Sequence, residues 1–136
     1  MANLNGTWIY RSFRPDKAPP SLVPWAPPGE LSVTTDETGK VNGKLKFPAV
    51  PGLELTISGS ITPAVAGSPG KLSIPEGVDL TGEGGRSSIN KLRGYFVPGS
   101  SGPVIVGTII AVQNDPAKQK DGTSGPFILL PATDKD

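Results

Sequence analysis

The sequence predicts an all-β protein, an antiparallel up-and-down barrel of about eight or nine short strands in a single domain spanning residues 1–136. Three observations lead to this prediction. Apolar and polar residues alternate along most of the chain, glycine and proline fall between the alternating runs, and helical periodicity is nearly absent. A β-sandwich is the alternative architecture, because it would show the same alternation.

The predicted strands follow one another about every ten residues. The first, residues 7–13, is apolar on both faces, with Trp8 and Tyr10 on one side and Ile9 and Phe13 on the other. Residues 31–34, 41–47 and 53–61 alternate strictly, which predicts one buried and one solvated face. Residues 71–74, 78–83 and 89–97 read as shorter or twisted strands, with Gly82 and Gly94 suited to bulges or tight bends. Residues 104–112 and 127–130 are again apolar on both faces.

The segments between these runs have the composition of tight turns. Asp36-Glu37-Thr38-Gly39 predicts a hairpin, and Pro51-Gly52, Ser68-Pro69-Gly70 and Pro98-Gly99 supply preset and left-handed backbone angles. Consecutive strands are therefore expected to pair antiparallel. Closing such a meander into a barrel removes its exposed edges, which favours the barrel over an open sheet.

Composition excludes several kinds of chemistry. The chain has no histidine and no cysteine, so histidine-based triads, thiolate nucleophiles and the usual zinc sites cannot form. We expect no metal and no cofactor, and the sequence leans against an enzyme. The net charge of +1 argues against nucleic acid as a partner, and no run of apolar residues predicts membrane insertion. The compartment stays open, either cytoplasmic or secreted after removal of a leader.

A proline-rich segment, Pro15 to Gly29, interrupts the pattern after the first strand. Its prolines exclude regular structure and stiffen the segment, which can hold Leu22 and Trp25 against another surface. One interpretation is that Trp25 plugs an end of the barrel as part of the core. The other is that the segment is a lid over a cavity and that Leu22 and Trp25 contact a ligand there.

Three strands that are apolar on both faces predict a contact surface. In an up-and-down barrel the first and last strands are neighbours, so residues 7–13, 104–112 and 126–130 would place their outer faces side by side. A contiguous apolar patch on a barrel wall usually marks a protein interface. We therefore expect self-association through these strands, with coverage by the proline-rich segment or a chain terminus as the alternative.

Three polar residues are the best predicted contacts for a ligand in or near the barrel. Tyr10 lies on the first strand, and Arg93 and Tyr95 share one face of theirs. Ligand cavities are mostly apolar, with a few such groups that fix orientation. The structural alternative is a phenol with a satisfied hydrogen bond and an arginine whose guanidinium reaches water.

The motif Asn5-Gly6-Thr7-Trp8 at the start of the first strand resembles the entry motif of the calycins, the lipocalin and avidin group. The resemblance rests on Gly6, Trp8 and the strand plan. It implies a barrel whose floor is closed by Trp8, with Pro15 to Gly29 in the place of the lipocalin lid. The basic residue and the C-terminal helix usual in lipocalins are missing, and two tryptophans are too few for a biotin pocket.

Three functions remain open on the sequence. The first is a non-catalytic barrel that binds a small, largely apolar molecule, with contacts from Trp8, Tyr10, Leu22, Trp25, Arg93 and Tyr95. The second is a cofactor-free isomerase or cyclase that positions an apolar substrate. The third is a structural or interaction module that assembles through its apolar outer strands.

Overall fold

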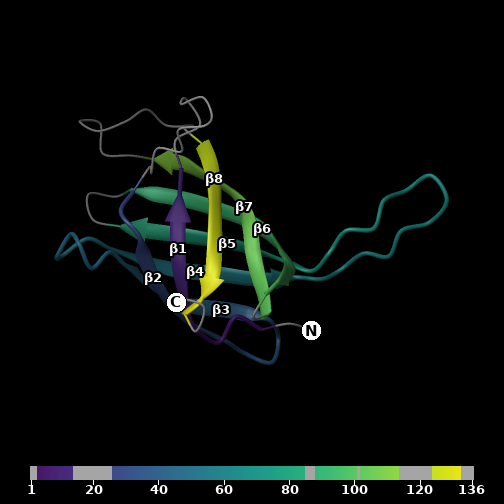
Figure 1. The fold of residues 1–136 in the computed structure, drawn as a ribbon, viewed down its shortest axis with the longest axis horizontal. Helices are drawn as coiled ribbons and strands as arrows, with labels where there is room; N and C mark the ends of the chain where they lie inside the picture. Colours follow the sequence, from purple (N-terminus) through teal and green to yellow (C-terminus); the bar gives the residue numbers. More distant parts are fainter. Residues whose placement is uncertain (1–2, 14–25, 85–87, 101, 114–123, 133–136) are drawn as a thin grey trace.

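The computed structural model describes residues 3–13, 26–84, 88–100, 102–113 and 124–132. These residues form a closed antiparallel barrel in which every strand pairs with its neighbour in sequence and the last strand pairs with the first (Figure 1). The strands are β1 (Gly6–Ser12), β2 (Gly29–Thr35), β3 (Lys40–Lys46), β4 (Glu54–Thr62), β5 (Gly77–Gly84), β6 (Ile89–Gly99), β7 (Gly102–Gln113) and β8 (Ser124–Pro131).

The predicted fold class is confirmed, and the ring of pairings excludes the sandwich. β1 pairs with β2 on one side and with β8 on the other, so the sheet has no free edge. We call the end of the barrel at which β1 begins the lower end. None of the described residues lies in an α-helix, and no helix among them is long and apolar enough to cross a membrane.

Alternate side chains of all eight strands point inward and form one apolar cluster. Leu4, Val41, Leu80, Ile105 and Leu129 have no exposed surface at all. Burying these aliphatic groups is the main force that closes the sheet.

Glycines on the inner wall accommodate large side chains from nearby strands. A Cβ at Gly94 would lie 3.1 Å from the Phe127 ring, and one at Gly29 would lie 3.1 Å from the Phe47 ring. Gly94 keeps its place in the ladder, opposite Val78 on one side, and the register shift recorded between β6 and β7 lies at Ile89 and Asn90 instead. In these places the missing side chain makes room for a neighbour's ring.

The lower end is closed by the segment that leads into β1. The Trp8 indole nitrogen donates a hydrogen bond to the Leu4 carbonyl oxygen at 2.9 Å, and the backbone nitrogen of Leu4 donates to the Thr35 hydroxyl at 2.8 Å. Gly6 has a φ of 115°, which a residue with a side chain rarely adopts. Trp8 is therefore buried near the lower end of the barrel and bonded to the segment that leads into β1.

The turn at Asp36 forms as its sequence predicts. One Asp36 carboxylate oxygen accepts hydrogen bonds from the backbone nitrogens of Thr38 and Lys40 and from the Thr38 hydroxyl, at 2.6–2.9 Å. These bonds, led by the one from the Thr38 hydroxyl, hold the pKa of Asp36 below its usual value. Gly39 completes the turn with a φ of 88°.

The predicted strand over residues 71–74 is not part of the barrel. It lies in a long hairpin between β4 and β5, residues 63–76, which projects away from the barrel (Figure 1). Two isolated bridges, Val65 with Ile74 and Ser68 with Lys71, hold this hairpin together, with a hydrogen bond of 3.0 Å from the Gly67 backbone nitrogen to the Ser73 hydroxyl. Its three prolines, Pro63, Pro69 and Pro75, stand at the base and at the turn, where they cannot donate to a ladder.

Candidate functional site

The structure places the predicted ligand contacts in two different environments. Trp8 and Tyr10 lie inside the barrel, with 7% and 2% of their surface exposed. Arg93 and Tyr95 point outward from β6 and are exposed. Leu22 and Trp25, and most of the proposed lid, lie outside the described residues. The described members of the set therefore do not converge on one site.

Tyr10 lies among aromatic rings in the upper half of the core. Its ring stacks near Phe127, with centroids 6.2 Å apart, and meets the edge of Phe47 at 6.1 Å. Burial raises the pKa of the phenol to about 12, and a hydrogen bond with the Ser12 side chain opposes part of that rise. Ser12 is itself buried, so these two hydroxyl groups form a small polar pair inside an apolar core. At neutral pH the phenol stays protonated.

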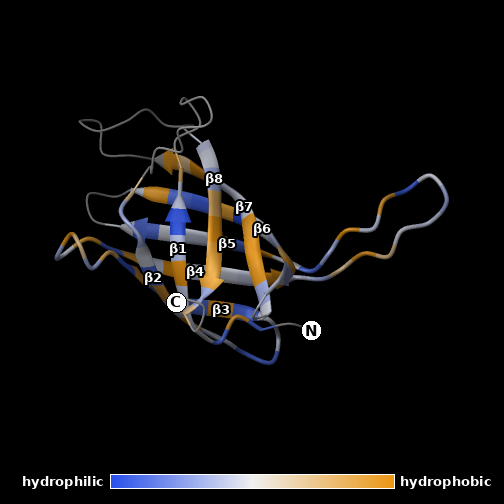
Figure 2. Cartoon of the chain, in the orientation of Figure 1, coloured by the Kyte–Doolittle hydropathy of each residue, from blue (hydrophilic) through white to orange (hydrophobic). Residues whose placement is uncertain are grey.

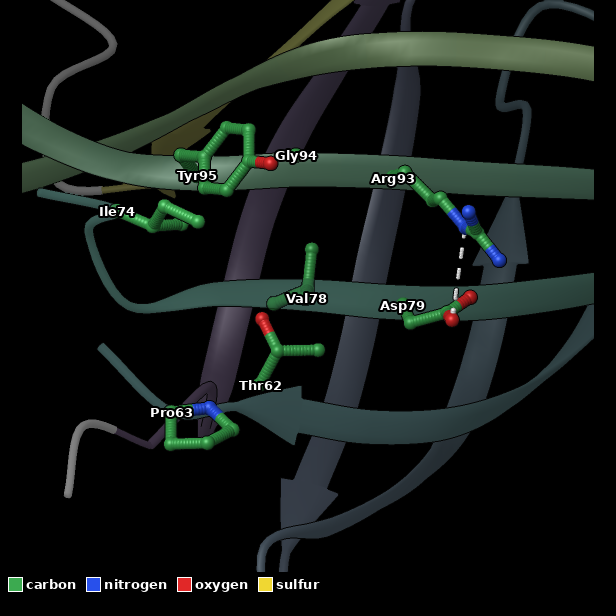
Figure 3. A pocket seen from close by; sticks show the side chains of 8 residues that line it. All are labelled: Thr62, Pro63, Ile74, Val78, Asp79, Arg93, Gly94 and Tyr95. Carbon is green, nitrogen blue, oxygen red and sulfur yellow. Dashed lines mark ion pairs between the residues drawn. The ribbon is translucent and has the colours of Figure 1, made fainter. Parts of the chain in front are cut away.

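Arg93 and Tyr95 lie together on the outer wall, in a pocket of about 340 Å³ at the base of the projecting hairpin. Figure 3 shows Tyr95 beside Ile74, with the ion pair of Arg93 and Asp79 at the other end of the group. The Arg93 Nε lies 3.5 Å from the Asp79 Oδ2, and both side chains are open to water. We call this pocket the hairpin groove; it is lined by Thr62, Pro63, Ile74, Val78, Asp79, Arg93, Gly94 and Tyr95.

A second pocket, of about 280 Å³, lies at the upper rim beside the turn between β3 and β4. Its wall is built from prolines and aliphatic residues of residues 47–53, with Lys46 and Glu54 at its edge. Glu54 forms an ion pair with Lys44, with 2.9 Å between the Lys44 Nζ and the Glu54 Oε1. The hydrogen bond from Lys44 holds the pKa of Glu54 below its usual value. Such solvated pairs contribute little to stability.

A row of apolar side chains outside the core lies on the outer wall of β6, β7, β8 and β1. Outward side chains there stand in register across the strands: Val97 opposite Val104, Tyr95 opposite Val106, Val106 opposite Ile128 and Leu130 opposite Ile9. Figure 2 shows the hydrophobic colour on β7 and β8 side by side. We call this surface the outer apolar face, defined as Ile9, Tyr95, Val97, Val104, Val106, Ile128 and Leu130.

Charged and polar residues border this face. Arg11 stands beside Ile128, Glu30 beside Ile9, and Arg93 and Thr108 face each other next to the row of Tyr95 and Val106. Protein interfaces commonly have an apolar centre and a polar rim of this kind. The neighbourhood of β1, β7 and β8 that the sequence predicts is thus present, and β6 joins it.

Two observations concern metal binding and proton transfer among the described residues. Within them no group of three acidic side chains gathers at one place. The buried phenol of Tyr10 has its pKa moved away from neutrality, whereas a general acid or base works best with a pKa near the working pH.

Comparison with protein-family models, with curated proteins and with solved structures finds no match for this chain.

Sequence reasoning did not find the hairpin groove as a unit. It picked out Arg93 and Tyr95, but the other wall comes from Thr62, Pro63 and Ile74 at the base of the hairpin. The signal was the segment 63–76, where prolines and glycines surround the short alternating run of residues 71–74. Such a segment is too irregular for a barrel strand and too apolar for an ordinary solvated loop.

Proposed function

We propose that this protein is a non-catalytic assembly module, a β-barrel that associates with a second copy of itself through the outer apolar face. The observation that carries the proposal is the register of apolar side chains across four adjacent strands, on a surface that the barrel does not need for its own core.

The free energies of burial and association favour a surface on which several apolar side chains are buried together over residues that are exposed singly. Moving a Val, Leu or Ile side chain fully out of water contributes about 1.5–3 kcal/mol, and a half-buried one contributes part of that. Association costs about 4–15 kcal/mol in lost freedom of motion, so several side chains must be buried together. Ile9, Val106, Ile128 and Leu130 are each only partly buried in one copy and lie on three neighbouring strands, which meets this requirement.

Packing of the barrel interior also supports assembly over binding inside the barrel. The inward side chains contact each other in a single cluster, and Phe127 and Phe47 occupy the space left by Gly94 and Gly29. Ligand-binding barrels need interior volume that side chains leave free. Here the rings of Phe127 and Phe47 fill space that would otherwise stay free beside Gly94 and Gly29.

The test compares lysine substitutions on two walls of the barrel. Ile128→Lys places a charge within the outer apolar face, between Val106 and the bordering Arg11. Thr56→Lys places the same charge at an exposed outward position of β4 and serves as the matched control. Light scattering after size exclusion should show a loss of the dimer for Ile128→Lys alone.

Far-UV circular dichroism and thermal unfolding of each variant establish that the barrel is intact. Should Ile128→Lys fold poorly, Val106→Lys tests the same surface from β7. Equal association of the control and of a folded face variant would contradict the proposal.

A second candidate is the binding of a small, largely apolar molecule at the upper end of the barrel. Two observations favour it. The Tyr10 and Ser12 hydroxyls form a polar pair among aromatic rings there, and Ala26, at the end of the proline-rich segment, packs against the core. The calycin resemblance agrees with this candidate, since it implies a ligand barrel with a lid.

Tryptophan fluorescence tests the second candidate. Quenching by a panel of apolar compounds, reduced by Trp25→Ala, would support a site under the proline-rich segment. An absence of saturable quenching across the panel would count against it. An isomerase or cyclase using the same place would in addition convert a bound compound, which product analysis of the same mixtures would detect.

A further inference from the structure

The hairpin of residues 63–76 exposes apolar side chains that its own chain does not cover. Leu72 is 90% exposed, Val65 is 51% exposed and Ile74 is 45% exposed. Figure 2 shows hydrophobic colour along this projection, well away from the barrel wall. A leucine so completely in water contributes nothing to the fold of the single chain.

The hairpin is held by few bonds of its own. Val65 and Ile74 exchange two backbone hydrogen bonds of 2.8 Å, and the Lys71 nitrogen donates to the Ser68 carbonyl oxygen at 2.8 Å around the turn at Gly70. A two-stranded hairpin standing alone in water is marginally stable. A further surface that buries its aliphatic side chains would stabilise it.

The hairpin groove offers a surface of matching chemistry. Its wall is apolar, with the Tyr95 ring lying over Gly77, where a Cβ would be 3.0 Å from the ring, and with Pro63 and Ile74 opposite. Asp79 supplies a carboxylate at the rim, with 35% of its side chain exposed. The hairpin carries one charge between Pro63 and Pro75, the cation of Lys71 next to Leu72. Asp79 already pairs with Arg93 at this rim, so the match lies in apolar surface: Tyr95, Pro63 and Ile74 suit the aliphatic side chains of the hairpin tip.

The hairpin groove and the outer apolar face are adjacent on the barrel and share one residue. Tyr95 belongs to both, since it lines the groove and stands opposite Val106 in the face. A second copy seated on the face thus lies next to the groove. Six extended residues from Pro63 to the turn at Ser68 reach about 20 Å beyond the barrel at roughly 3.3 Å per residue, enough to cross to a neighbouring molecule.

We propose that the hairpin of one copy docks into the hairpin groove of a second copy, with Leu72 against Tyr95 and Lys71 near Asp79. This inference rests on the proposed self-association and names the segment that completes it. In a two-fold dimer the same contact forms twice, once from each copy, because each chain carries both the hairpin and the groove.

Cysteine cross-linking tests the contact directly, because the natural chain contains no cysteine. One variant carries Leu72→Cys; a second, distinguished by a size tag, carries Thr62→Cys in the groove. Thr56→Cys, at an exposed outward position on the same strand, replaces Thr62→Cys in the matched control. Mild oxidation of the mixed proteins should link Leu72→Cys to Thr62→Cys at least about tenfold faster than to Thr56→Cys, because a disulfide needs Cα atoms within about 7 Å. Equal rates would overturn the inference.

A single substitution separates this inference from the proposed function. Leu72→Ser should raise the dimer dissociation constant by about tenfold or more, because one large aliphatic side chain per copy loses its burial. If Ile128→Lys abolishes the dimer while Leu72→Ser leaves its dissociation constant unchanged, the docking is wrong and the outer apolar face still stands. If the unmodified chain is a monomer at every concentration, both are wrong.

Discussion

Replacing Phe127 by alanine is the most informative perturbation of the barrel interior. The ring is 2% exposed, stacks near Tyr10 with centroids 6.2 Å apart and fills the space beside Gly94. Truncating a ring this enclosed should lower the free energy of unfolding by about 3–5 kcal/mol, since apolar burial is lost and the surrounding strands relax only in part. Denaturant unfolding followed by circular dichroism measures the loss.

The control and the refuting result concern how tightly the interior is packed. Val50→Ala, at a side chain 40% exposed in the turn between β3 and β4, should change stability by less than about 0.5 kcal/mol. A loss below about 1 kcal/mol for Phe127→Ala, with an unchanged denaturant slope, would mean that the ring touches little. The interior would then hold free space, and this result would favour ligand binding inside the barrel over self-association as the function.

Three further outcomes follow from the contacts described. Tyr10 has a pKa of about 12 in the folded chain against 10.0 in the unfolded one, so the contribution of Tyr10 to stability should be constant below pH 10 and fall by about 2–3 kcal/mol as the pH rises to 12; Tyr10→Phe should remove that part of the fall in alkaline titrations of the unfolding free energy. Asp36→Ala should lower the unfolding temperature at neutral pH, and the difference from the natural chain should narrow as the pH drops through the depressed pKa of the Asp36 carboxylate, whereas a constant difference would contradict the role of its charge. Gly107→Ala should destabilise the barrel by at least about 3 kcal/mol, because a Cβ there would meet the backbone oxygen of Arg93 on β6; near-normal unfolding would show that the two strands can separate without cost.

Much of the fold could be predicted because local sequence and global structure agree. Apolar and polar residues alternate in 31–34, 41–47 and 53–61, which is the pattern of strands with one buried face. The first segment lies within β2, and the other two match β3 and β4 to within one residue at each end. Asp36 and Gly39 specify their turn through side-chain hydrogen bonds and a left-handed φ, which are properties of a few consecutive residues.

Features that depend on distant residues were harder to predict. Residues 71–74 have a strand-like pattern, but whether a strand joins a barrel depends on a neighbour to pair with, and the hairpin extends beyond the barrel end. The direction of Arg93 and Tyr95 was likewise open, because the period of two assigns them to one face without saying which face is inside. They lie beside Thr62 and Ile74 because β4 pairs with β5 and β5 pairs with β6. These pairings join residues far apart in the sequence, so no local pattern predicts them.

Sedimentation velocity of the unmodified chain across micromolar concentrations tests the central claim most directly. Association through the outer apolar face predicts an average mass above the 14.0 kDa of one chain, rising with concentration towards that of two copies. A single 14.0 kDa species over the whole range would contradict it.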